Sequence, residues 1–367
     1  MRYKLLIPIL ILLIGVISGC QQAPPAPSEP SAATVAESSA DPSGEPAQSE
    51  TAEGPYKKIV KTSGAYSYEQ MVKDIKALEK QYPELIQTGL IGQSVEGREL
   101  PLIKLGTGGK NIFLCGAHHA REYITSTYLM KMADEYAYAY ANGGDFDGRD
   151  IKSLVDDFTV YIVPMVNPDG VNLVQNGPEA AKDPDEVKKI KMLKSSYSEW
   201  KANIRGVDLN RQYPVSWDVK ASNTDVPSSE MYKGSAPASE PEVQAVMKLC
   251  NEVSFELAVS FHSKGEIIYW ADSGTVDAIP AARGLAETLS QTTGYEVMPV
   301  SEDPAVYGAG FENWFRAEFS RPGFCIELTP SSGDSLPSDD KQFEKLVWSK
   351  TKDLGIQLME EAKKLKN

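Results

Sequence analysis

Four short apolar runs, each rich in β-branched and aromatic residues, place the strongest constraint on what this chain can fold into. They lie at residues 111–116, 158–165, 255–261 and 323–328, and each has the length and composition of a strand buried on both faces. Segments with helical periodicity separate them. The expected helices span residues 66–81, 124–140, 239–251 and 343–365, and a further strand is expected at 100–105. Because strands alternate with helices, the sequence predicts an α/β fold around a largely buried central sheet.

Two short polar motifs mark the ends of expected elements. The Asn-Pro-Asp-Gly motif at residues 167–170 combines residue types typical of tight turns and is expected to stop the strand before it. The Ser-Glu-Pro-Glu motif at residues 239–242 resembles a capping box, which would open the helix after it.

The first twenty residues have the pattern of an export signal. Arg2 and Lys4 precede an uncharged apolar run at residues 5–17, and a small-residue cleavage site ends at Cys20. The run is too short to span a bilayer, which takes about 20 helical residues. The position of Cys20 favours a bacterial lipoprotein signal at residues 1–20, with lipidation of this cysteine, over a plain secretory signal. The sequence therefore predicts an exported protein, anchored to the cell membrane only through lipid and facing the cell wall or periplasm.

Residues 21–54 differ sharply in composition from the rest of the chain. They hold six prolines and six acidic residues, but no aromatic residue and no Leu, Ile, Lys or Arg. Such a segment cannot bury enough apolar surface to offset the entropy cost of ordering, so it is expected to be a disordered tether. Residues 55–367 contain no second linker and no internal repeat, and we expect them to form one large domain of a monomeric protein.

Charge and cysteine content exclude several classes of protein. Lys and Arg total 37 against 51 Asp and Glu, and the net charge of −14 argues against a nucleic-acid partner and against a polybasic membrane-surface protein. Four cysteines in 367 residues rule out a disulfide-rich scaffold. Cys115, Cys250 and Cys325 lie in or beside apolar runs, so they are expected to be buried free thiols.

The chain has three histidines, and all of them follow expected buried strands. Ligands of open α/β sheets bind at the carboxyl ends of strands, so His119 and His262 are expected to meet there. Glu122 lies three residues after His119 and would share one face of a helical turn with it. Two imidazoles and one carboxylate are the protein ligands of a catalytic zinc site. We therefore expect one Zn²⁺ held by His119, Glu122 and His262, and His118 ranks lower as a ligand than as a packing residue.

Further polar residues supply what a zinc site needs for catalysis. Glu327 ends an apolar strand, where poor solvation would raise its pKa toward that of a general base. Asn210 and Arg211 offer donors for a substrate carboxylate. Lys201 and Arg205 lie just upstream, and either cation could polarise a carbonyl. Glu327 and Arg211 also have a purely structural reading, as members of a salt bridge at a strand end and within a loop.

A metal-binding histidine usually donates its other ring N–H to a carboxylate or carbonyl. Asp169 and Asp208 are the candidates for this second contact, and the sequence does not choose between them.

Taken together and in this order, the motifs resemble those of the zinc carboxypeptidase family over roughly residues 66–365. His119-Ala120-Arg121-Glu122 is similar to the family's His-x-Arg-Glu metal motif. The resemblance implies a mixed, mainly eight-stranded central sheet flanked by helices. It also implies roles for particular residues: metal ligands His119, Glu122 and His262, substrate-binding residue Arg121, terminal-carboxylate pair Asn210 and Arg211, and catalytic Glu327.

Within that family, stretches at residues 68–71, 91–98, 164–171, 200–203 and 205–211 resemble the bacterial γ-D-glutamyl-meso-diaminopimelate peptidases. This resemblance implies hydrolysis of peptidoglycan stem peptides, at the bond between γ-D-glutamate and diaminopimelate, by zinc-activated water. One alternative is an exported metallocarboxypeptidase that removes C-terminal residues from ordinary peptides. Another is a catalytically inactive wall-binding lipoprotein.

Two features depart from the family's pattern. Digestive members place a tyrosine between the third metal ligand and the catalytic glutamate, whereas here Tyr307 precedes the stretch 312–316 and no tyrosine follows it. The family's carbonyl-polarising arginine maps to Lys201 or Arg205, and we assign Arg205 because an always-charged fork suits an oxyanion. Glu312 is expected to be a solvated surface charge, with contact to the distal amino group of diaminopimelate as the alternative.

Overall fold

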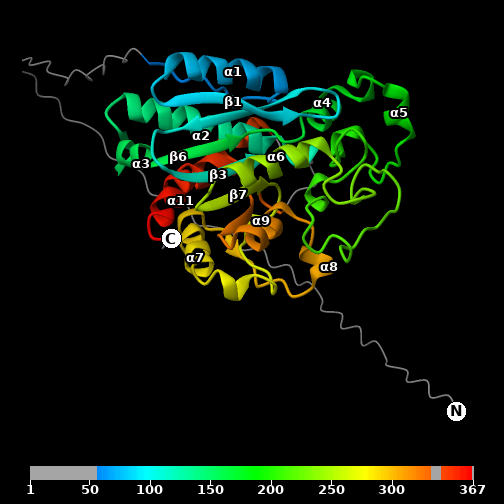
Figure 1. The fold of residues 1–367 in the computed structure, drawn as a ribbon. Coiled ribbons are helices and arrows are strands. Elements are labelled where there is room, and N and C mark those ends of the chain that lie inside the picture. Colours follow the sequence, from blue (N-terminus) through cyan, green and yellow to red (C-terminus); the bar gives the residue numbers. More distant parts are fainter. Residues whose placement is uncertain (1–55, 332–339, 366–367) are drawn as a thin grey trace, which may run out of the picture. The chain divides into compact units, whose positions relative to one another are not determined.

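A mixed sheet of eight strands lies at the centre of the fold (Figure 1). The structure is a computed structural model, and it describes residues 56–331 and 340–365. The strands are β1 (Ile86–Gln93), β2 (Glu99–Leu105), β3 (Lys110–Gly116), β6 (Phe158–Val163), β7 (Leu257–His262), β8 (Ile267–Tyr269), β9 (Glu296–Val297) and β10 (Gly323–Glu327), with a separate ribbon of β4 (Asp145–Phe146) and β5 (Arg149–Asp150). Their order in the main sheet is β1-β2-β6-β3-β7-β10-β8-β9.

The four apolar runs of the sequence form the middle of this sheet. β6, β3, β7 and β10 are neighbours and run parallel, whereas the β1–β2, β2–β6 and β10–β8 pairs are antiparallel. The predicted α/β class and the mixed eight-stranded sheet are confirmed.

Helices cover both faces of the sheet. On β3, Ile112 and Leu114 face one hydrophobic core, and the alternate residues Phe113 and Cys115 face a second. Helices α1 (Tyr68–Gln81), α2 (Ile124–Ala141), α3 (Ile151–Asp157), α4 (Pro168–Asn176), α5 (Pro184–Lys189), α7 (Ala281–Thr293) and α11 (Leu354–Ala362) contribute to the first core, and α6 (Pro241–Glu252) and α9 (Phe311–Phe319) to the second. Because both faces are buried, the central strands read as continuous apolar runs.

Three expected details differ in the structure. The Asn-Pro-Asp-Gly motif begins α4, with the Asn167 side chain accepting a hydrogen bond from the Gly170 N–H at 3.0 Å, so it is a helix start as well as a strand end. The capping-box prediction is wrong, because Ser239 Oγ donates to Gln212 Oε1 at 3.1 Å and the N-cap Glu240 makes no capping hydrogen bond. The expected C-terminal helix is divided into a π-helical turn (Glu344–Trp348), α10 (Ser349–Thr351) and α11.

Several predictions concern segments that lie wholly or partly outside the described residues. The signal at residues 1–20, lipidation at Cys20 and the tether at 21–54 lie outside the described residues and stay predictions. The described residues, 56–331 and 340–365, belong to one compact unit. Within the described part of the chain, no helix is long and apolar enough to cross a membrane. Cys115, Cys250 and Cys325 are buried and free, as predicted.

Candidate functional site

The last residues of three adjacent parallel strands, β3, β7 and β10, lie at one edge of the sheet. In the sheet register, Gly116 at the end of β3 pairs with Phe261, and Glu327 at the end of β10 pairs with His262 at the end of β7. Beyond Gly116 the chain turns sharply at Ala117, whose φ of 49° is in the left-handed region and whose N–H donates to Thr125 Oγ1 at 2.8 Å. This turn brings the residues that follow β3 over the end of β7.

His119, Glu122 and His262 form a buried group that is positioned to bind a metal ion. The Nδ1 atoms of the two histidines lie 3.0 Å apart, Glu122 Oε1 lies 3.0 Å from His119 Nδ1, and Glu122 Oε2 lies 2.9 Å from His262 Nδ1. Nitrogen and carboxylate oxygen are ligand types of zinc, whose bonds of about 2.0–2.1 Å in a tetrahedron set ligand atoms about 3.3 Å apart. The three donor atoms therefore fit one zinc ion in chemistry and in spacing.

Charge within this group favours metal binding. Burial alone would raise the pKa of Glu122, but the contacts with His119 and His262 outweigh it and hold the pKa well below its usual range. The carboxylate is thus ionised, as a ligand must be.

Asp208 is the carboxylate that lies beside the second ring nitrogen of His119. Its Oδ1 lies 3.2 Å from His119 Nε2, and its Oδ2 lies 3.2 Å from Arg211 Nε and 3.8 Å from Lys201 Nζ. Burial would raise the pKa of Asp208, but these cations and the histidine hold it well below its usual range. The other candidate, Asp169, pairs instead with Arg98 at 2.7 Å.

His118 is a packing residue in this arrangement. Its Nε2 lies 2.9 Å from the Tyr213 hydroxyl, and its ring stacks on that of His262 with centroids 5.9 Å apart. Burial, with the nearby His262 and His119, holds its pKa well below the usual range, so the ring is neutral. It lies outside the metal-binding group of the described residues.

Glu327 faces the same site from β10. Burial raises its pKa above the ordinary value, and the charge of Glu122 adds to the rise, in the direction that its strand-end position suggests. Its Oε2 is buried and has no hydrogen-bond partner among the described residues, which leaves this oxygen available to a substrate or water.

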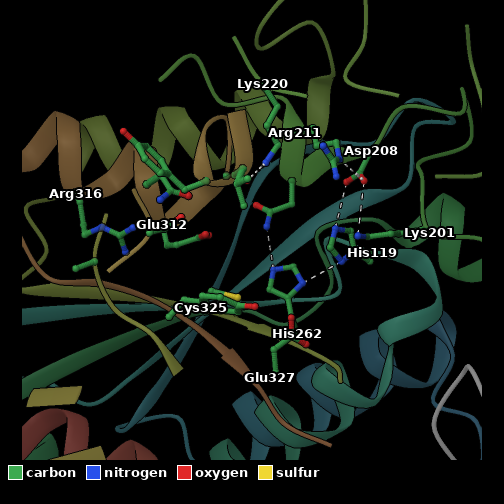
Figure 2. A pocket seen from close by; sticks show the side chains of 18 residues that line it. His119, Lys201, Asp208, Arg211, Lys220, His262, Glu312, Arg316, Cys325 and Glu327 are labelled. Carbon is green, nitrogen blue, oxygen red and sulfur yellow. Dashed lines mark hydrogen bonds and ion pairs between the residues drawn. The ribbon is translucent and has the colours of Figure 1, made fainter. Parts of the chain in front are cut away.

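A cavity of about 280 Å³ opens beside the metal-binding group (Figure 2). Of the residues that the sequence singled out, its lining includes His119, His262, Lys201, Asp208, Asn210, Arg211, Tyr307, Glu312 and Glu327. The Asn210 amide is fixed at the wall, because its Oδ1 accepts the Phe311 N–H at 2.9 Å and its Nδ2 lies 3.4 Å from His262 Nε2. Most of the site residues predicted from the sequence thus line this one cavity.

Apart from the metal ligand Glu122, two predicted site residues, Arg205 and Arg121, do not line the cavity. The Arg205 side chain is 54% exposed and lies 3.5 Å from Glu240, outside the lining. Its direction follows from Asn203, whose Oδ1 accepts the Arg205 N–H at 3.0 Å and closes a tight turn. Arg121 donates to the Glu199 carbonyl at 2.7 Å and pairs with Glu230 at 3.0 Å. Of the two cations left open by the sequence, Lys201 is the one at the cavity.

The prediction of a solvated Glu312 is wrong. Glu312 is only 8% exposed and lines the cavity from the first turn of α9. Arg316, four residues later on the same helix face, also lines it and pairs with Asp272 at 2.7 Å. The sequence analysis missed Arg316, although its spacing from Glu312 was a usable signal, and it missed Lys220, for which the surrounding loop sequence gave none.

Comparisons with known proteins agree with this geometry. A family model described as zinc carboxypeptidase matches residues 71–347. Gamma-D-glutamyl-L-diamino acid endopeptidase 1 of Lysinibacillus sphaericus is 36% identical over 277 residues, which cover 74% of this chain and 67% of that protein. Carboxypeptidase B of Astacus astacus is 28% identical over 305 residues, covering 76% of this chain and 93% of that protein.

Solved structures show the same fold. Bovine thrombin-activatable fibrinolysis inhibitor, in complex with tick carboxypeptidase inhibitor, aligns with a TM-score of 0.63 at 19% identity, covering 83% of this chain and 99% of that one. Carboxypeptidase A from Helicoverpa armigera aligns with a TM-score of 0.60 at 19% identity, covering 84% of this chain and 76% of that one.

Proposed function

Because this chain belongs to the zinc carboxypeptidase family and is a zinc metallopeptidase, we propose that it hydrolyses peptidoglycan stem peptides at the bond between γ-D-glutamate and diaminopimelate. The name of the Lysinibacillus sphaericus relative supports this substrate class, since it specifies a γ-D-glutamyl bond to an L-diamino acid. Within the structure, the observation that carries the proposal is the buried Glu312 carboxylate in the cavity beside the metal-binding group.

Glu312 suits a substrate whose leaving side carries an ammonium group. Its Oε2 and the Asn313 Oδ1 are buried and have no hydrogen-bond partner among the described residues. Gly310 leaves space for the two side chains, because a Cβ there would lie 2.9 Å from the other Glu312 oxygen, Oε1, and 2.7 Å from Asn313 Oδ1. Buried acceptors without partners are costly, and an ammonium donor would satisfy both. Diaminopimelate carries such a group at its distal carbon.

The chain's own residues divide the chemistry between them. When bound by His119, Glu122 and His262, zinc supplies Lewis-acid chemistry, since it polarises a carbonyl and acidifies water. Glu327 takes the proton of the attacking water and returns it to the departing amine. Lys201 stabilises the negative charge that develops on the carbonyl oxygen. Asn210 and Arg211 hold a carboxylate on the leaving side and fix where the peptide is cut.

Product analysis of two substrates tests the proposed function. The zinc-loaded protein is incubated with L-Ala-γ-D-Glu-meso-diaminopimelate and with an unmodified peptide of ordinary L-amino acids, and the products are identified by mass spectrometry. We expect release of diaminopimelate from the first and little cleavage of the second. Removal of C-terminal residues from the ordinary peptide alone would instead identify a metallocarboxypeptidase, and no cleavage by a zinc-loaded protein would favour a wall-binding role.

The two candidate cations are expected to differ strongly on substitution. Lys201→Met should lower kcat by about 10²-fold, the scale on which loss of one oxyanion-stabilising donor acts. Arg205→Met should change kcat by less than about threefold, because its side chain is exposed and lies outside the cavity lining. Steady-state kinetics on the muropeptide measure both variants. A large loss for Arg205→Met with little loss for Lys201→Met would restore the assignment made from sequence.

We also propose that the predicted lipid at Cys20 and the tether at residues 21–54 hold the catalytic domain near the cell wall. Export, an anchor and a flexible tether suit a peptidoglycan substrate. Labelling with a radioactive fatty acid, compared between the native chain and Cys20→Ala, tests the anchor.

A further inference from the structure

Lys220 places a cation in the cavity that the proposed mechanism does not use. It lines the cavity beside Arg211 (Figure 2). The Arg211 Nη1 donates a hydrogen bond at 2.6 Å to the carbonyl of Ala221, the residue that follows Lys220. The Lys220 ammonium donates to the Val306 carbonyl. An ammonium group has three donors, so two remain for a ligand.

The positive charges on this wall exceed the negative charges that neutralise them. Arg211 and Lys201 share a single carboxylate, that of Asp208. No acidic side chain of the described residues forms an ion pair with Lys220. Burial, with the nearby Arg211, lowers the pKa of Lys220 to about 8, so an anion placed beside it would favour its charged form.

Two further charged residues of the lining, Arg316 and Glu312, have the reverse arrangement. Arg316 is neutralised by Asp272, and both side chains are buried. Glu312 keeps a buried carboxylate oxygen without a partner in the described part of the chain. Besides Lys201, which the proposed mechanism uses, the cavity therefore offers two cationic positions, at Arg211 and Lys220, and one anionic position at Glu312.

We propose that Lys220 binds a second carboxylate of the residue on the leaving side, so that the site selects a residue with two carboxylates and a side-chain ammonium over one with a single carboxylate. This inference rests on the proposed function, in which Arg211 holds the first carboxylate and Glu312 the ammonium. C-terminal diaminopimelate has this set of charges. Lysine has the same carbon chain but lacks the distal carboxylate, so the two residues differ only in the group that Lys220 would bind.

The test compares L-Ala-γ-D-Glu-meso-diaminopimelate with L-Ala-γ-D-Glu-L-Lys as substrates of the zinc-loaded protein. We expect the native protein to prefer the diaminopimelate peptide by about tenfold or more in kcat/KM, the scale of one buried charge-assisted hydrogen bond. Lys220→Gln keeps a donor for the Val306 carbonyl but removes the charge. It should lower the ratio of the two kcat/KM values by about tenfold, mainly through a higher KM for the diaminopimelate peptide, and Lys220→Arg should restore most of the preference.

Lys233→Met is the matched control for loop structure. Lys233 donates to the Trp217, Asp218 and Lys220 carbonyls, so it supports the same loop, and it does not line the cavity. We expect this variant to leave the substrate ratio unchanged. If Lys220→Gln lowers cleavage of both substrates equally, Lys220 has only a structural role and the inference is wrong.

Two further outcomes separate this inference from the proposed function. A native protein that cuts both substrates equally well would overturn the role of Lys220 and leave the γ-D-glutamyl specificity standing. A native protein that cuts neither substrate but trims an ordinary peptide would overturn the proposed function and, with it, the role of Lys220.

Discussion

Glu327→Gln is expected to lower kcat by about 10³-fold while the protein keeps its zinc. Proton transfer by a positioned general base contributes about 10²- to 10⁴-fold to catalysis, and an amide cannot take up the proton. Glu327 stands at the end of β10 beside His262 in the sheet register, but it is not a member of the metal-binding group. Steady-state kinetics on the muropeptide measure the loss in kcat. The zinc content of the purified variant shows whether the metal is retained.

The substitution should not unfold the protein. Burial raises the pKa of Glu327 in the folded state, so its ionised form costs stability as pH rises above the ordinary carboxyl pKa toward the folded-state value. Glutamine removes that cost and has nearly the same shape. The metal-free variant should therefore unfold at the same temperature as the native chain at pH 4, and at an equal or higher temperature at pH 8.

Glu302→Gln is the matched control, because it makes the same charge change at an exposed side chain of the segment before α8 (Pro304–Tyr307). It should keep nearly full activity. Normal turnover by Glu327→Gln would show that another group is the base, and loss of zinc from that variant would show that Glu327 is needed to hold the metal.

The elements that carry the metal-binding group were predictable because local patterns determine them. β3, β7 and β10 are buried on both faces, so their sequences are unbroken apolar runs that few other structures explain. Parallel strands end at the same edge of a sheet, which is why histidines after two such runs meet. The three-residue spacing of His119 and Glu122 then fixes their side chains on one turn.

The loop residues of the site were harder to predict because long-range hydrogen bonds decide their positions. Arg205 and Lys201 lie four residues apart in one loop, and only the turn closed by Asn203 separates the exposed cation from the one in the cavity. Neither composition nor periodicity reports such a turn.

The positions of Tyr307 and Lys220 in the cavity wall were also not predictable from local sequence. Three backbone hydrogen bonds join its two distant segments: the Tyr213 N–H to the Ala309 carbonyl, the Ala309 N–H to the Val215 carbonyl, and the Ala221 N–H to the Ala305 carbonyl, at 3.1, 2.7 and 3.0 Å. The capping-box prediction is wrong for the same reason, because the Ser239 hydroxyl donates its hydrogen bond to the distant Gln212 side chain. Local signals fail where another part of the chain offers a better partner.

His262→Ala is expected to abolish the stabilisation that zinc gives to the folded protein. His262 Nδ1 lies within 3.0 Å of a donor atom of each other ligand, and its side chain is buried at the end of β7. Zinc at 1,000 times its dissociation constant should stabilise the native chain by about 4 kcal/mol. At about 2 °C per kcal/mol for a domain of this size, the unfolding temperature should rise by about 8 °C.

The variant retains only two of the three protein ligands, so the same zinc concentration should raise its unfolding temperature by less than about 2 °C. Thermal unfolding with and without zinc, together with metal content after dialysis, provides the measurement. His118→Phe is the control, because His118 stacks on His262 yet stands outside the metal-binding group. This variant should keep one zinc per chain and the full zinc-dependent shift. If His118→Phe loses zinc while His262→Ala retains it, the metal is held by a different set of residues, and the pairing of β3 with β7 at the sheet edge would then serve the fold alone.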